Sequence, residues 1–180
     1  MTVTELLERT HSLADEGDWA GAADLLREHL QDVEDVPAVH CWLGVAEREL
    51  GMEGVAYERF KRALALDPED PYILATAGNG IASFDDPDAE RVLRAAAVTA
   101  PELPLARMMY GAYLSREGFA EQAVQELEAA RELDSEDTEI AYELGVAQST
   151  VSRHLASALR KLGLKSKVEL ASMGFRPAKR

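Results

Sequence analysis

The chain has 180 residues with a formal net charge of −14 at pH 7, and 47% of them are hydrophobic. This apolar content excludes wholesale disorder, and no apolar run approaches the roughly 20 residues needed to span a bilayer. The acidic N-terminal segment lacks the basic and apolar regions of a signal peptide and the single cysteine excludes an intrachain disulfide, so we expect a cytoplasmic protein without a membrane partner.

The charge is distributed unevenly along the chain. Residues 148–180 carry eight bases and one acid, giving +7, whereas the preceding 147 residues carry 11 bases and 32 acids, giving −21. A polyanion such as DNA would be repelled by most of the molecule and attracted to its C-terminal end. A solvated helical surface is the simpler explanation of the acidity.

The chain contains an internal repeat of about 34 residues, with four repeats in the first 137 residues and a register that continues to Gly145. One residue is missing from the third repeat, in the turn FDDPD at 84–88, which shortens one interval to 33. Glycine, alanine and large apolar residues recur together at intervals of 34, 33 and 34, as in Gly44, Gly78, Gly111 and Gly145; Ala22, Ala56, Ala89 and Ala123; and Leu26, Phe60, Leu93 and Leu127. A further series comprises Gly17, Gly51 and Gly118, with Asp85 in the place of the fourth glycine.

Each period has the pattern of two helices. In the second repeat, apolar residues lie on one face of a first helix, and a second apolar stripe begins after Gly51 and ends before Asp67-Pro68. Gly44 and Ala56 are small enough to let the two helices approach closely. The sequence therefore predicts an all-α fold of stacked helix pairs.

The period and the LG…G…A…F…A…P skeleton resemble the tetratricopeptide repeat. The resemblance covers four repeats, 3–36, 37–70, 71–103 and 104–137, and implies a right-handed α-solenoid whose first helices line a groove for a protein or peptide partner. The lysine- and asparagine-rich carboxylate clamp of some relatives is matched only at Asn79. By register the groove would expose Cys41, Val45, Arg48, Tyr72, Asn79, Met108, Ala112 and Arg116. Arg48 and Arg116 are the bases expected in this groove, and they favour an apolar or mildly acidic peptide.

The segment ELGVAQSTVSRHLASALRKLGLKSKVEL, residues 143–170, follows the repeats. Read as a fifth repeat it is poor, because Ser152 replaces the turn glycine and Lys161 a large apolar residue. A short helix over 138–144, a turn at 145–147 with Gly145, and a second helix over 149–163 fit better, and predict a helix-turn-helix unit.

This segment resembles the LuxR/GerE-type DNA-binding domain over residues 138–171, most specifically in LRKLGLKSKVEL. The resemblance implies that 149–162 is a recognition helix in a major groove, with double-stranded DNA bound through 149–167. The implied contacts to DNA are Ser149, Thr150, Arg153, His154, Arg160 and Lys161. Ser166–Ala171 would begin the helix through which relatives dimerise, which raises a homodimer as an open question, and 172–180 would form a flexible basic tail.

Two features depart from that family. Ala147 stands where relatives have a serine cap, and the longer first helix is absent, so that residues 119–133 of the last repeat would have to replace it.

No catalytic, metal-binding or cofactor-binding pattern is apparent, and we expect no enzyme activity and no cofactor. His40 and Cys41 are adjacent and point to different sides of a helix, and the GNG at 78–80 lacks the context of a phosphate-binding loop. The sequence predicts an intracellular regulator with a peptide-binding array and DNA-contacting C-terminal helices. The alternative is a scaffold whose C-terminal helices only cap the solenoid.

Overall fold

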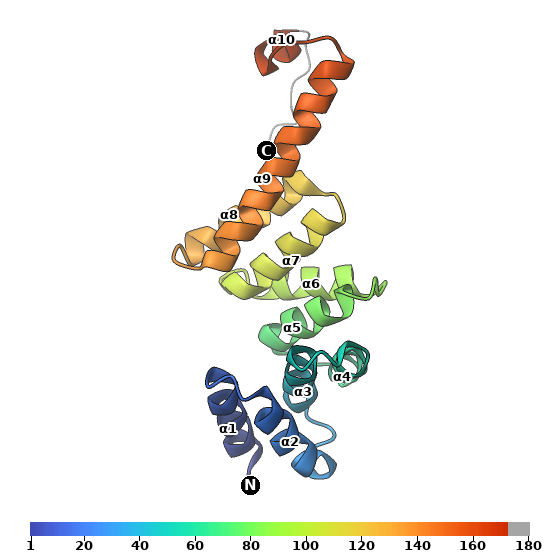
Figure 1. The fold of residues 1–180 in the computed structure, drawn as a ribbon, viewed down its shortest axis with the longest axis vertical. Helices are drawn as coiled ribbons and strands as arrows, with labels where there is room; N and C mark the ends of the chain where they lie inside the picture. Colours follow the sequence, from blue (N-terminus) through green and yellow to red (C-terminus); the bar gives the residue numbers. More distant parts are fainter. Residues whose placement is uncertain (173–180) are drawn as a thin grey trace.

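Every regular element is a helix in the computed structural model, which describes residues 1–172 (Figure 1). The predicted all-α solenoid is therefore confirmed. The elements are α1 (Val3–Asp15), α2 (Trp19–His29), the 3-10 turn η1 (Leu30–Asp32), α3 (Pro37–Glu49), α4 (Glu53–Ala65), α5 (Pro71–Ala82), α6 (Ala89–Thr99), α7 (Pro104–Arg116), α8 (Ala120–Leu133), α9 (Thr138–Lys161) and α10 (Lys167–Ser172). Residues 173–180, which make up almost all of the predicted flexible basic tail, lie outside the described residues.

The first eight α-helices form four pairs that stack along the long axis of the molecule (Figure 1). Three of the first helices begin with a proline, whose fixed φ and missing N–H suit the first turn of a helix. The turns inside three pairs contain Gly17, Gly51 and Gly118 with φ of 77°, 75° and 87°, which glycine adopts without the strain of a side chain. Asp85, with φ of 53°, has the same role in the third pair, as its place in the series predicted.

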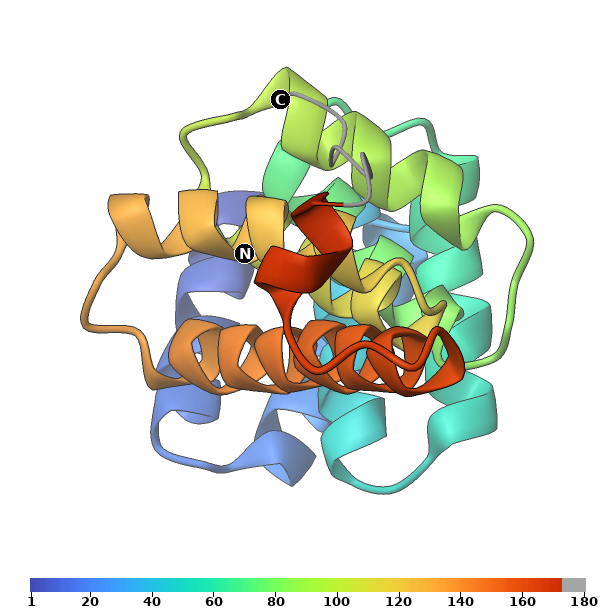
Figure 2. The same ribbon diagram turned by 90° about the horizontal axis from the view of Figure 1, so that it is seen from above.

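A large residue and a small one occupy corresponding positions at three of the four junctions between each helix pair and the next helices. Leu26 and Ala46 lie in one core cluster, and Leu127 and Ala147 lie in another, with the members of each set 20 positions apart. The corresponding residues at the junction of the second and third repeats are Phe60 and Gly80. At the junction of the third and fourth repeats they are Leu93 and Tyr113, which are both large. Figure 2, which looks along the stack from the C-terminal end, shows the helix pairs behind one another.

Asp86 links the shortened turn of the third pair to the second pair. Its carboxylate accepts hydrogen bonds from the Tyr57 hydroxyl at 2.7 Å, from Lys61 Nζ at 3.0 Å and from the backbone amide of Asp88 at 2.9 Å. Burial by itself raises the pKa of Asp86, but these three donors outweigh it, so the pKa lies below its ordinary value. The shortened turn of the third repeat is thus held to the second repeat by the hydrogen bonds of Asp86.

We expect Asp86→Ala to lower the free energy of unfolding at pH 7 by about 2 kcal/mol, because hydrogen bonds to a charged group are lost. Since the folded pKa is lowered, the contribution of Asp86 is complete above the ordinary pKa of about 3.9 and is lost as pH falls below it. Urea unfolding of both proteins at pH 7, 5 and 3 should show the difference shrinking only at pH 3. Glu58→Ala removes an exposed acid from α4 and is the control. A difference that is equally large at pH 3 would contradict this role.

The turn predicted at residues 145–147 is wrong, because α9 is one uninterrupted helix of 24 residues. Gly145 is not among the residues with positive φ and has open space around it. Asp137 caps the helix by accepting hydrogen bonds from the amides of Glu139 and Ile140.

The continuous helix keeps its apolar residues in phase. Ile140, Leu144 and Ala147 are buried against α7 and α8, and Val151 and Leu155 continue the same stripe beyond them. A turn at Gly145 would take the second half of the stripe out of line with the first half, which α7 and α8 cover. Helix propagation is then the more favourable outcome.

Candidate DNA- and peptide-binding surfaces

The second half of α9 projects beyond the helix pairs, with α10 at its far end (Figure 1). Ile140, Leu144 and Ala147 are at most 3% exposed, whereas no side chain from Gln148 to Lys161 is buried. The apolar stripe of the projecting part, with Val151 and Leu155, is half-buried, and most of its polar side chains are exposed.

The predicted DNA contacts lie together on one face of this projecting helix. Ser149, Arg153 and Arg160 follow one helical row, and Thr150, His154 and Lys161 follow the row beside it. All are exposed except Thr150, which is half-buried. The Thr150 hydroxyl donates to the Val146 carbonyl at 3.1 Å and accepts from Arg153 Nη2 at 3.2 Å.

This face is cationic. No acid occurs between residues 148 and 161, and no ion pair holds Arg153, Arg160 or Lys161 within the described residues. The hydroxyls of Ser149 and Thr150 stand at its start. We name these six predicted contacts the basic face of α9; it offers hydroxyl and guanidinium groups that can bind phosphate or base edges.

The end of α9 agrees with the predicted end of the second helix. Gly163 has φ of 69°, and the Leu164 amide donates to the Leu159 carbonyl at 2.8 Å, which closes the helix. Ser166 directly precedes α10, and its hydroxyl accepts a hydrogen bond from the Glu169 amide in the first turn at 3.2 Å. The helix expected to begin near Ser166 is therefore present.

The predicted groove residues divide into accessible and buried groups. Tyr72 and Arg116 are exposed, and Val45, Arg48 and Asn79 are half-buried. The prediction of exposure is wrong for Cys41, Met108 and Ala112, which are 1%, 5% and 8% exposed. These three pack between neighbouring helices, because a helix in a solenoid has neighbours on both sides and exposes only a narrow strip.

Two of the accessible polar residues meet. Arg116 Nη2 donates to Asn79 Oδ1 at 3.5 Å, which brings α5 and α7 together at this surface. The other predicted base, Arg48, lies 5.8 Å from the centre of the Phe60 ring and 3.7 Å from a carboxylate oxygen of Glu49. Arg48 is therefore partly neutralised, and Arg116 is the less engaged of the two.

A row of aromatic rings on the first helices was missed by the sequence reasoning. The Trp42 ring lies 4.3 Å from the His11 ring and stacks on Tyr72 at 6.3 Å with an interplanar angle of 20°. These residues are 31 and 30 positions apart, about one helical turn less than the repeat period, so they meet across neighbouring first helices. The row offers an aromatic contact surface for a partner, with Trp42 and Tyr72 nearly parallel and His11 tilted by 55° to Trp42.

The buried Cys41 has no features of a reactive thiol. Burial raises its pKa to about 12, so it stays protonated at neutral pH. Within residues 1–172 no group of three or more His, Cys, Asp or Glu side chains is placed to hold a metal ion. None of the described helices has both the length and the apolarity required to cross a membrane.

Residues 134–174 match the bacterial regulatory proteins of the luxR family, a family of DNA-binding regulators. The sequence resemblance of the C-terminal segment is thus confirmed, although its turn is absent from the structure. No curated protein sequence matches the chain.

The fold is similar to solved tetratricopeptide repeat structures. Residues from 41 to the end of MamA from Desulfovibrio magneticus RS-1 are 20% identical, with 96% of this chain and 97% of that chain covered and a TM-score of 0.64. YrrB, a tetratricopeptide repeat protein described as having an unusual peptide-binding site, is 19% identical, with 82% and 76% covered and a TM-score of 0.60. A tetratricopeptide repeat protein from Parabacteroides merdae is 17% identical, with 83% and 60% covered and a TM-score of 0.61. At these identities the likeness establishes the fold alone.

Proposed function

We propose that this protein is an intracellular regulator whose repeat array binds a protein or peptide and whose basic face of α9 contacts double-stranded DNA. The observation that carries the proposal is the projection of this face beyond an acidic array, in a segment that matches a family of DNA-binding regulators. The array and the projecting helix then have separate partners.

The dimensions of α9 suit a major groove. Residues 148–161 form a helical rod about 21 Å long at 1.5 Å per residue, and a major groove about 12 Å wide admits a helix. Ser149 and Arg153 would face base edges, and Arg160 and Lys161 would face phosphates. An uninterrupted helix can insert in this way, because only its exposed half has to enter the groove.

The acidic array opposes this approach. We expect weak binding by a single chain, since the −21 of residues 1–147 repels phosphate. A homodimer would place two basic faces about 34 Å apart, one turn of DNA, and favour a palindromic site. A partner that covers acidic surface of the array would also strengthen DNA binding, because it would reduce the repulsion of phosphate.

The aromatic row supports a peptide-binding role for the array. His11, Trp42 and Tyr72 supply apolar contact, and Arg116 supplies a base on the same series of first helices. An apolar or mildly acidic peptide fits these groups. The fold of the array, shared with a relative that has a peptide-binding site, is consistent with this role.

A scaffold without DNA binding is the second candidate. It is favoured by the absence of the turn at 145–147, which leaves α9 as a capping helix with an extension. In that case the basic face would contact an acidic protein or nothing at all.

DNA binding separates the two candidates. We expect the wild type to shift genomic or random duplexes near 50 mM salt, and the double variant Arg153→Ala, Lys161→Ala to lose most of this binding. If both bases contact phosphates, the slope of log K against log salt should become shallower by about 1.8 in the variant. Mobility-shift titrations at several salt concentrations measure both quantities.

The matched control is Arg91→Ala, Arg94→Ala, which removes the same charge from exposed positions on α6. If this control lost as much DNA affinity as the Arg153→Ala, Lys161→Ala variant, net charge alone would explain the effect. Absence of any shift by the wild type at low salt would favour the scaffold.

A further inference from the structure

Three guanidinium groups converge on an open depression in the first two repeats. The depression lies between η1, α3 and α4, and its floor includes the buried ring of His40. Among the lining residues Glu34 is the one acid, and the polar ones that matter here are Arg27, Gln31, Arg59 and Arg62. This concentration of positive charge is unexpected in an array that carries −21 in total.

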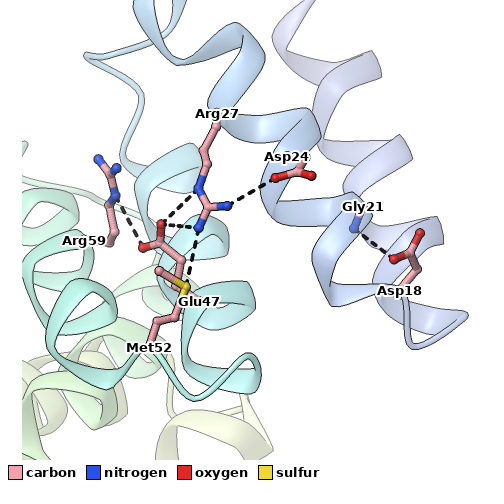
Figure 3. A network of polar contacts seen from close by, with 7 residues as sticks. All are labelled: Asp18, Gly21, Asp24, Arg27, Glu47, Met52 and Arg59. Atoms are coloured by element: carbon pink, nitrogen blue, oxygen red, sulfur yellow. Dashed lines mark hydrogen bonds and ion pairs between the residues drawn. The ribbon is translucent and has the colours of Figure 1, made fainter.

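One buried carboxylate forms ion pairs with two of these guanidinium groups. Glu47, 1% exposed, contacts Arg27 Nη2 at 2.9 Å and Arg59 Nε at 3.5 Å (Figure 3). Arg27 is also paired with Asp24 at 3.2 Å. Arg27 is therefore fully engaged, whereas Arg59 uses only Nε, and its outer nitrogens point away from Glu47 in Figure 3.

Arg62 is the least engaged of the three. Within the described residues its one polar contact is a 3.5 Å hydrogen bond from Nη2 to the Glu34 carbonyl oxygen, and its side chain is exposed. The same carbonyl lies 2.9 Å from His40 Nε2. Burial, together with the charges of Arg59 and Arg62, lowers the pKa of His40, so the ring is neutral at pH 7 and adds no charge to the floor.

We propose that this depression binds a tetrahedral oxyanion of the phosphate class. The outer edge of Arg59 and the fork of Arg62 would donate to different oxygens, with the exposed amide of Gln31 as a further donor. Guanidinium groups bind phosphate through paired, charge-assisted hydrogen bonds. Arg59 and Arg62 lie on α4 and Gln31 lies on η1, so the donors come from two elements and suit an anion with oxygens in several directions. The source is either free inorganic phosphate or a phosphate monoester, which share this chemistry.

The site is independent of the basic face of α9, which lies at the other end of the solenoid (Figure 1). An anion here would connect η1 with α4 and so link the first two repeats. Binding to the folded state alone would also raise the melting temperature as phosphate concentration rises.

The test is a titration of the full chain with potassium phosphate, followed by the side-chain Nε–Hε resonances of the arginines in ¹⁵N NMR. Potassium chloride at matched ionic strength is the reference. We expect saturable shifts for Arg59 and Arg62 in phosphate and not in chloride. Arg62→Gln should weaken the affinity about 10-fold or more, the loss of one hydrogen-bonded charge. Arg91→Gln, at an exposed arginine of α6, should leave it unchanged.

Shifts that do not saturate, or that chloride reproduces, would overturn the proposal, as would an Arg62→Gln variant with wild-type affinity. Far-UV circular dichroism checks that the variant is folded, and the wild-type titration decides the question without it. A parallel titration with O-phosphoserine identifies the source: tighter binding than inorganic phosphate indicates a monoester, and equal or weaker binding indicates the free anion. Neither titration contains DNA, so failure of DNA binding would not affect this result.

Discussion

Gly80→Ala should destabilise the protein by about 1–3 kcal/mol, near the upper end of that range, although alanine favours a helix over glycine. A Cβ atom at position 80 would overlap the ring of Phe60, which is 1% exposed. The opposite edge of the ring packs closely on Gly44, where an added Cβ would lie 2.8 Å from it, so little room is left for the ring on that side. Overpacking of this kind costs more than the roughly 1 kcal/mol gained in helix propensity. Urea unfolding measures the difference.

The rescue for this variant is Phe60→Leu. Leu26 with Ala46 and Leu127 with Ala147 are two of the three corresponding pairs elsewhere in the solenoid, so the double variant Phe60→Leu, Gly80→Ala reproduces a combination that the fold already uses. We expect the penalty of Gly80→Ala to fall by at least half in the Phe60→Leu background. Gly54→Ala, in α4 with open space around it, is the control and should stabilise the protein slightly. An equal penalty in both backgrounds would show that the ring is not the cause.

A chain ending at residue 137 should lose about 3–6 kcal/mol and aggregate, whereas a chain ending at residue 151 should remain close to wild type. The shorter chain lacks Ile140 and Leu144, which are 0% and 3% exposed, and each buried side chain of this size contributes about 1.5–3 kcal/mol. It also uncovers Leu127 and its neighbours on α7 and α8. The longer chain keeps these contacts and loses residues 152–180, which include most of the projecting half of α9 and the whole of α10. Thermal unfolding and sedimentation of both proteins provide the comparison.

Two point variants in the full chain test the same difference between the packed first half of α9 and its projecting half. Ile140→Asp places a charge in the last core cluster and should unfold or aggregate the protein. Leu155→Asp lies on the same stripe but outside that cluster, and should change the melting temperature little. If both variants were equally destabilised, the projecting half of α9 would have to be packed against something in solution, and a second copy of the chain would be the first partner to examine.

The solenoid could be predicted from the sequence because each repeat carries its own local signals. Gly17, Gly51 and Gly118 mark turns that need positive φ, and Asp85 was correctly placed as their substitute. These signals act within a few residues, and the period of 34 repeats them often enough to exclude coincidence. The resemblance of the C-terminal segment could be predicted for the same reason, because its motif lies within one short stretch of sequence.

The tertiary structure alone decided which side chains meet. Gly80 looked like an unremarkable part of a GNG sequence until the Phe60 ring was found against it, and Cys41 was assigned to a groove although its helix has neighbours on both sides. Gly145 is compatible with either a turn or a helix. In the structure the first half of the apolar stripe of α9 is buried against α7 and α8, and the helix continues straight through Gly145 with the second half in phase. Local sequence determines what a segment can form, and the available packing partners determine which of those forms it adopts.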